Sequence, residues 1–103
     1  MLHVLVIAVV AAGLSAIPVS AEDAAVIEAG EQVFAENCQP CHGERLASPS
    51  PNTDLKNLKA ADRARFEQRV MDGKPPMPPW RGVLGPAEIE QLWAYIRANA
   101  YSQ

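Results

Sequence analysis

Two cysteines and a histidine lie within five consecutive residues of the chain. The run Cys38-Gln39-Pro40-Cys41-His42 has the pattern C-x-x-C-H, which is the attachment sequence for a c-type haem. Two thiols at this spacing on one tight turn can each form a thioether bond with one of two neighbouring vinyl groups. The adjacent imidazole can then ligate the iron from the same side. The motif therefore predicts one covalently attached haem per chain, held by Cys38 and Cys41, with His42 as an axial ligand.

Other uses of two nearby thiols fit the sequence less well. A thioredoxin-like motif needs a βαβ setting, and no segment alternates clearly enough between apolar and polar residues to predict a strand. A structural zinc ion needs four ligands, whereas the chain after residue 21 has two thiols and a single imidazole. A disulfide between Cys38 and Cys41 would close too short a loop to stabilise a domain.

Haem iron has a second axial position, and the ligand there decides whether small molecules can bind. The candidates are Met71, Met77 and a lysine. Met71 falls near the end of a predicted helix, where methionine commonly serves as packing material. Met77 lies in the run KPPMPPW (74–80), whose prolines stiffen a loop and hold a side chain at a fixed place. We therefore expect Met77 to be the second axial ligand, which would give a six-coordinate His/Met iron.

Two other function classes stay open at this point. If Met77 does not ligate, the iron is five-coordinate and the protein is a gas sensor or an enzyme that binds small molecules at the vacant position. If the N-terminal segment is retained as an anchor, the chain is a fixed cytochrome subunit of a larger redox complex.

The elements that must hold these residues are predicted to be helices. Apolar residues at helical spacing and helix start and stop signals place them at 23–37, 59–71 and 86–99. Asp23 can cap the first helix, Gly73 can end the second, and Pro86 suits the first position of the third. The turn-forming segment 43–57 and the proline-rich segment 74–79 are predicted to be loops. The fold class is therefore all-α, with three to four helices around the haem.

A haem would also supply the missing centre of so small a domain. Below about 80 residues a single hydrophobic core is marginal without a staple. The residues expected to pack against the porphyrin are Val33, Phe34, Leu58, Phe66, Leu84 and Trp93. We therefore expect the haem-free chain to be largely unfolded.

The N-terminus reads as a secretory signal peptide. Residues 2–17 are almost wholly apolar and precede Pro18, and Val19 and Ala21 place small residues around a cleavage site. The apolar run is short for a membrane span, which needs roughly 20 such residues. We expect residues 1–21 to be removed by cleavage after Ala21, which leaves a domain of residues 22–103 in the periplasm. Association with a membrane is expected only if the segment is retained.

Charge is distributed unevenly along the chain, whose net charge is −3. Residues 22–44 contain acidic residues, the last of which is Glu44, and no lysine or arginine. Residues 45–81 are net basic. Ordinary solvated helix faces and a docking patch both explain this pattern. The small number of basic residues argues against nucleic acid. The partners expected are redox proteins with an acidic docking surface.

The motifs together resemble a small bacterial cytochrome c of the His/Met type. Gly30-x-x-x-Phe34 precedes the C-x-x-C-H motif, and Met77-Pro78 and Leu92-Trp93-Ala94-Tyr95-Ile96 follow it. The resemblance covers essentially all of residues 22–103. It implies the cytochrome c fold, in which the N- and C-terminal helices cross near a right angle. Gly30 and Phe34 would then face Leu92 and Tyr95.

The resemblance also implies a function and two further roles for side chains. It implies an electron-transfer protein rather than an enzyme, moving single electrons between partners such as a dehydrogenase and a terminal oxidase. A monomer is expected, because no apolar seam in the sequence demands a dimer. The resemblance places Trp80 at the haem edge or near a propionate. In the family a proline carbonyl commonly accepts the N–H of the ligating histidine. The segment SPSPNTDL (48–55) leaves Pro49 and Pro51 as alternatives for that acceptor, which would orient the imidazole.

Overall fold

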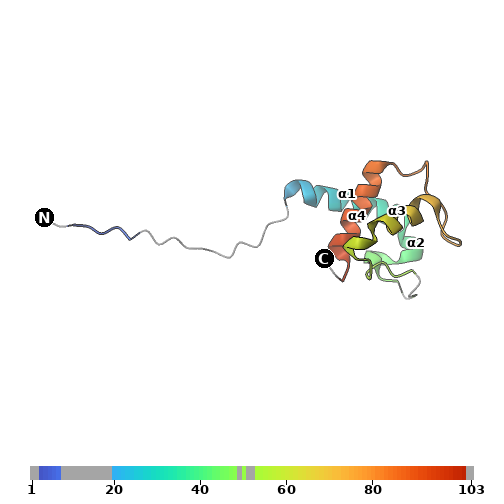
Figure 1. Cartoon of the computed structure of the whole chain (residues 1–103), viewed down its shortest axis with the longest axis horizontal. Coiled ribbons are helices and arrows are strands. Elements are labelled where there is room, and N and C mark those ends of the chain that lie inside the picture. Colours follow the sequence, from blue (N-terminus) through green and yellow to red (C-terminus); the bar gives the residue numbers. More distant parts are fainter. Residues whose placement is uncertain (1–2, 8–19, 49, 51–52, 102–103) are drawn as a thin grey trace.

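The computed structural model describes residues 3–7, 20–48, 50 and 53–101. Its helices are α1 (Ala21–Asn37), α2 (Gln39–His42), α3 (Arg63–Asp72) and α4 (Pro86–Asn99), with the short 3₁₀ turns η1 (Glu44–Leu46) and η2 (Ala60–Asp62). Between the described residues the only β-type pairings are two isolated bridges. The all-α prediction is therefore confirmed (Figure 1).

Helix α1 begins two residues earlier than the sequence predicted. Ser20 is its N-cap, and the Ser20 hydroxyl accepts a hydrogen bond from the Asp23 N–H at 3.1 Å. The expectation that Asp23 caps the helix is wrong, because a serine hydroxyl already serves the free N–H groups of the first turn. Asp23 lies inside that turn, where its carboxylate suits the positive end of the helix dipole.

The predicted signal peptide falls mostly on residues 8–19, which lie outside the described part of the chain. The cleavage after Ala21 stays a prediction. Within the described ranges, the structure contains no helix of the length and apolarity that crossing a membrane requires.

Helices α1 and α4 pack against one another where Gly30 permits it (Figure 1). A Cβ atom on Gly30 would lie 1.9 Å from the Gln91 carbonyl oxygen and 2.9 Å from the Tyr95 Cβ. Four residues later the Phe34 and Tyr95 rings lie 5.3 Å apart between centroids. The predicted contact between these two helices is confirmed, and it depends on a residue without a side chain.

The two later helices follow the predicted signals closely. The segment expected to be helical over 59–71 consists of η2 followed by α3, and Gly73 ends it with a φ of 69°. Pro86 opens α4, and the Glu88 carboxylate accepts the Gly85 N–H at 3.1 Å. These helix ends lie where the sequence placed them because glycine and proline act locally.

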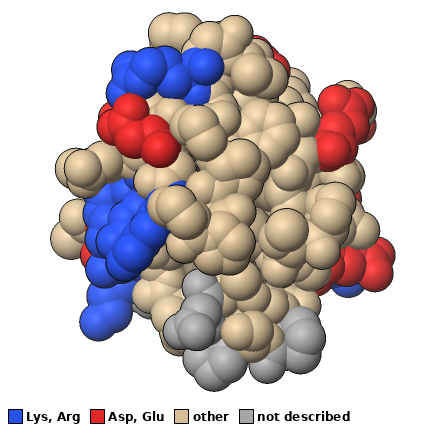
Figure 2. All heavy atoms as spheres, turned by 90° about the vertical axis from the view of Figure 1, so that its right-hand side faces the viewer, with Lys and Arg blue, Asp and Glu red and all other residues tan. Residues whose placement is uncertain are grey.

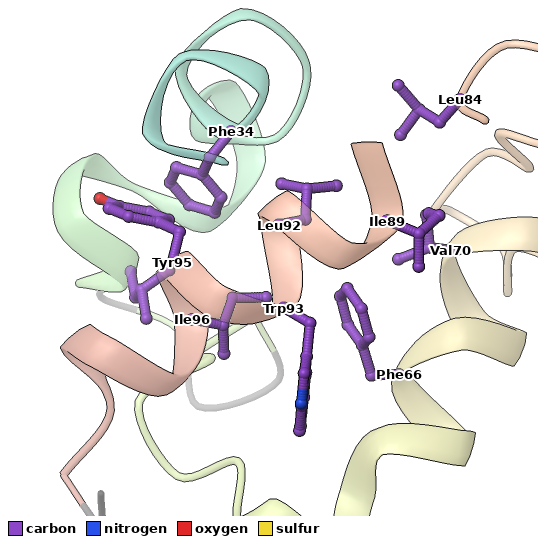
Figure 3. Packing of buried hydrophobic residues seen from close by; sticks show 10 residues of the cluster. Phe34, Phe66, Val70, Leu84, Ile89, Leu92, Trp93, Tyr95 and Ile96 are labelled. Atoms are coloured by element: carbon purple, nitrogen blue, oxygen red, sulfur yellow. The ribbon is translucent and has the colours of Figure 1, made fainter. Parts of the chain in front are cut away.

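The buried core lies where α4 meets α1 and α3 (Figure 3). Four of the six residues expected to pack against the porphyrin are buried in this core: Phe34, Phe66, Leu84 and Trp93. Val33 and Leu58 are partly buried and pack against that core. Leu46, which is fully buried, was not predicted because it lies in a segment expected to be loop.

Candidate haem site

The cysteine motif forms a compact helical turn at the end of α1. The His42 N–H donates to the Cys38 carbonyl at 2.9 Å, and the Cys41 N–H reaches the same oxygen at 3.2 Å. Cys38 is partly buried and Cys41 is exposed, and both are free thiols. The one-turn helix α2 was not predicted, since four residues carry no periodic signal. It gives the motif the tight turn that two attachment points require.

The His42 ring is oriented by a backbone carbonyl. Its Nδ1 lies 2.7 Å from the Thr53 carbonyl oxygen. A carbonyl only accepts, so Nδ1 carries the proton and Nε2 keeps a free lone pair for a metal. The expected acceptors Pro49 and Pro51 lie outside the described residues, and the carbonyl that makes this bond belongs to Thr53. No sequence signal could have identified Thr53, because every residue carries the same acceptor.

His42 faces an apolar cleft that is partly open to solvent and has a cavity volume of about 100 Å³. Hydrophobic side chains from all sides of the cleft make up most of its lining: Phe34, Leu55, Leu58, Phe66, Val70, Leu92 and Ile96. Cys38 and Met77 line the same cleft. The structure therefore brings the predicted site residues Cys38, His42 and Met77 together, although Met77 is far from the other two in the sequence.

Met77 is held in place by the backbone of its own loop. Lys74 and Met77 exchange two backbone hydrogen bonds, at 2.7 Å and 3.1 Å. The loop is also tied to the end of α3, because the Trp80 N–H donates to the Val70 carbonyl at 2.8 Å. Met71, the other candidate ligand, packs against the core and is not part of the cleft lining. The geometry thus favours Met77 over Met71 as a residue that can reach a bound cofactor.

Trp80 is partly buried and packs against the core, and it does not line the cleft. Its expected position at the haem edge or near a propionate stays a prediction. The polar side chains other than His42 and the Cys38 thiol that do line the cleft are Arg65 and Arg69, four residues apart on α3. Two guanidinium groups at the rim of an apolar cleft suit the two carboxylates of a haem.

Burial raises the pKa of the Cys38 thiol to about 11, with a smaller contribution from the neighbouring Cys41. Two thiols, an oriented imidazole, a thioether and an apolar cleft together fit a c-type haem. When bound, that group supplies reversible one-electron chemistry.

Comparison with known proteins agrees with this fit. The family described as "Cytochrome C oxidase, cbb3-type, subunit III" matches residues 25–96. Cytochrome c6 of Euglena viridis is 31% identical over 78 residues, which cover 69% of this chain and 90% of that protein. No solved structure matches the chain significantly.

Two longer relatives contain the same segment. The quinohemoprotein alcohol dehydrogenase ADH IIB of Pseudomonas putida is 36% identical over 78 residues, but the match spans 11% of its length. The cbb3-type cytochrome c oxidase subunit FixP of Bradyrhizobium sp. (strain ORS 278) is 36% identical over 76 residues, or 26% of its length. Taken together, the cleft, the motif and these relatives show that the chain belongs to the cytochrome c family, as a small monohaem electron-transfer protein with covalently bound haem.

Proposed function

We propose that this cytochrome is a single-electron carrier in which Cys38 and Cys41 form the thioether bonds and His42 and Met77 are the two axial ligands. The observation that carries the proposal is the shared cleft. Cys38 and His42 reach it from the end of α1 and from α2, and Met77 reaches it from the loop after α3. Imidazole and thioether are the axial pair of cytochromes c, and the thioether raises the reduction potential.

The residues of the cleft explain why such a site would transfer electrons without binding small molecules. The Thr53 carbonyl holds the His42 ring in one tautomer and orientation. The apolar lining excludes water, and the backbone-tied loop keeps Met77 at the cleft. With both axial positions taken by side chains, no coordination position is left for gas binding or peroxide chemistry.

Carbon monoxide binding to the reduced holoprotein tests this proposal. The wild-type protein should bind the gas slowly, because Met77 must first leave, whereas Met77→Ala should bind it rapidly. Met71→Ala is the matched control and should behave like the wild type, since Met71 packs outside the cleft. Rapid binding by the wild-type protein would refute the proposal and favour the sensor or enzyme alternative.

The proposed carrier works as a monomer in the periplasm, after removal of residues 1–21, and docks on an acidic surface of its redox partners. The face that carries α2 and the loop after α3 supports this (Figure 2). Most of its Lys and Arg side chains lie along one edge, with an acidic group between them. Other acids lie at the opposite edge, and the centre is uncharged. Weak redox complexes have small interfaces and rely on charge steering.

The ionic strength of the solution tests the docking proposal. Reduction of the cytochrome by an acidic redox protein should slow as salt is added, because screening removes the steering. A partner dehydrogenase as donor and a terminal oxidase as acceptor fit this role. Rates that do not change with salt would refute the proposal of a charge-steered docking surface and leave the proposed His/Met ligation intact.

A second candidate function is a fixed cytochrome subunit or domain of a larger redox complex. It is favoured by the two relatives in which the matched segment is a minor part of a longer protein. Mass spectrometry of the protein purified from its own cells distinguishes the two. A product of residues 22–103 plus one haem supports the free carrier, whereas a retained N-terminus in a stable complex supports the fixed subunit.

A further inference from the structure

The segment 53–58 both orients His42 and forms part of the cleft wall. Its first residue, Thr53, supplies the carbonyl that accepts the His42 ring N–H. Leu55 and Leu58 line the cleft. The segment belongs to no helix of the described chain, and its internal hydrogen bonds are short-range, such as that from the Leu58 N–H to the Leu55 carbonyl at 3.2 Å. Its position must therefore be set by something outside the segment.

The end of α4 supplies that support. The Arg97 Nη1 donates to the Leu58 carbonyl at 2.5 Å. The Tyr101 N–H donates to the Lys56 carbonyl at 2.9 Å, and the Lys56 ammonium lies 5.4 Å from the centre of the Tyr101 ring. Two backbone carbonyls of the segment are thus held by the residues at and just beyond the end of one helix.

Arg97 is itself held rigidly against the core. Its guanidinium lies 5.6 Å from the centre of the Trp93 ring, within the distance of a cation–π contact. Trp93 is buried and its ring lies 5.0 Å from the Phe66 ring (Figure 3). The Arg97 side chain therefore connects the packed core to the otherwise weakly held segment.

We propose that Arg97 is a positioning residue for His42. By holding the Leu58 carbonyl, its guanidinium fixes the segment 53–58 and with it the Thr53 carbonyl that orients the imidazole. The inference rests on His42 being the axial ligand proposed above. A histidine ligand whose second N–H is bonded to a carbonyl is oriented and made more basic by that bond. Loss of Arg97 should therefore loosen the His42 bond and raise the reduction potential.

Three variants of the holoprotein test the proposal. Arg97→Gln removes the charged donor, and Arg97→Lys keeps the charge and one donor. Arg81→Gln is the matched control, because Arg81 makes a charged pair with Asp72 at 2.6 Å that has no connection to the segment 53–58. The readouts are the solvent exchange of the His42 ring N–H, followed by NMR in the ferrous state, and the reduction potential.

Arg97→Gln should speed exchange of the His42 ring proton about tenfold or more, the factor that corresponds to losing one charge-assisted hydrogen bond. It should also shift the potential upward. Arg97→Lys should fall between this variant and the wild type, and Arg81→Gln should match the wild type. A merely structural role would lower the melting temperature without moving either readout.

The contrary outcomes separate this inference from the proposed function. A protected His42 proton in the wild type that Arg97→Gln leaves unchanged overturns the inference alone. A wild-type protein without a protected His42 ring proton overturns the ligand assignment and the inference with it. Failure of both Arg97 variants to attach haem also overturns the inference, because a positioning residue leaves folding and attachment intact.

Discussion

The molecule has two regions that are stabilised in different ways. The helical frame, made of α1 and α4, is held by direct packing between helices, with Gly30 against Gln91 and the Phe34 ring against Tyr95. The cleft wall, made of the segments 53–58 and 73–85, is held by individual hydrogen bonds and faces an apolar cleft. The frame has direct side-chain contacts of its own, whereas the wall surrounds a space that the haem would fill. In so small a domain we expect neither region to persist without the haem.

Removal of the haem is the largest change that this comparison predicts. A haem-free Cys38→Ala/Cys41→Ala variant should lose cooperative unfolding and most of its helical signal, because a domain this small cannot offset an empty apolar cleft. Circular dichroism during a thermal melt measures this against the haem-loaded wild type. Native-like helicity with a cooperative transition in the haem-free variant would show that the frame does not depend on the cofactor.

A frame substitution should lower stability and leave the haem spectrum alone. Gly30→Ala would place its Cβ 1.9 Å from the Gln91 carbonyl oxygen, and we expect a loss of about 3 kcal/mol in the free energy of unfolding, at the upper end of overpacking effects. Chemical denaturation of the holoprotein measures it.

Gly82→Ala is the matched control for Gly30→Ala. Gly82 has a φ of 80° and open space around it, so this change should cost about 1 kcal/mol, from backbone strain alone. Equal losses in the two variants would contradict the account of the frame, because the loss at Gly30 would then not come from the contact between α1 and α4.

In contrast to Gly30→Ala, a substitution in the cleft wall should change the reduction potential of the haem more than it changes the free energy of unfolding. Met77→Ala should lower the reduction potential by on the order of 0.2 V, since axial ligands shift haem potentials over a range of about 0.8 V. Its loss of unfolding free energy should be smaller than that of Gly30→Ala. Spectroelectrochemical titration and denaturation of the same samples check both. An unchanged potential would mean that the thioether does not touch the iron.

The difference between the helical frame and the loops around the cleft also explains which features the sequence could predict. The ends of α3 and α4 were predicted because Gly73 and Pro86 act on their own backbone, and the cofactor was predicted because its motif is contiguous. Burial of Leu46 and the role of the Thr53 carbonyl could not be predicted. Both depend on how loops fold in three dimensions, and the sequence does not distinguish a leucine that will be buried, or a carbonyl that will accept a hydrogen bond, from any other.

The smallest effect concerns the first turn of the frame. Ser20→Ala in the full-length protein should cost about 1 kcal/mol, the typical value for an N-cap, because it removes the acceptor of the Asp23 N–H. Protein cut after Ala21 lacks this cap, so its melting temperature should match that of the uncut Ser20→Ala variant more closely than that of the uncut wild type. Thermal melts of the three proteins make the comparison. A full-length Ser20→Ala variant as stable as the wild type would show that the cap adds nothing.

The proposed function requires that His42 and Met77, which line one cleft, both bind the iron. The visible spectrum of the oxidised protein tests it most directly, because sulfur-to-iron charge transfer gives a weak far-red band only when a thioether is an axial ligand. We expect this band in the wild type and in Met71→Ala, and its loss in Met77→Ala. A wild-type protein without the band, or a Met77→Ala variant that keeps it, would show that Met77 does not bind the iron.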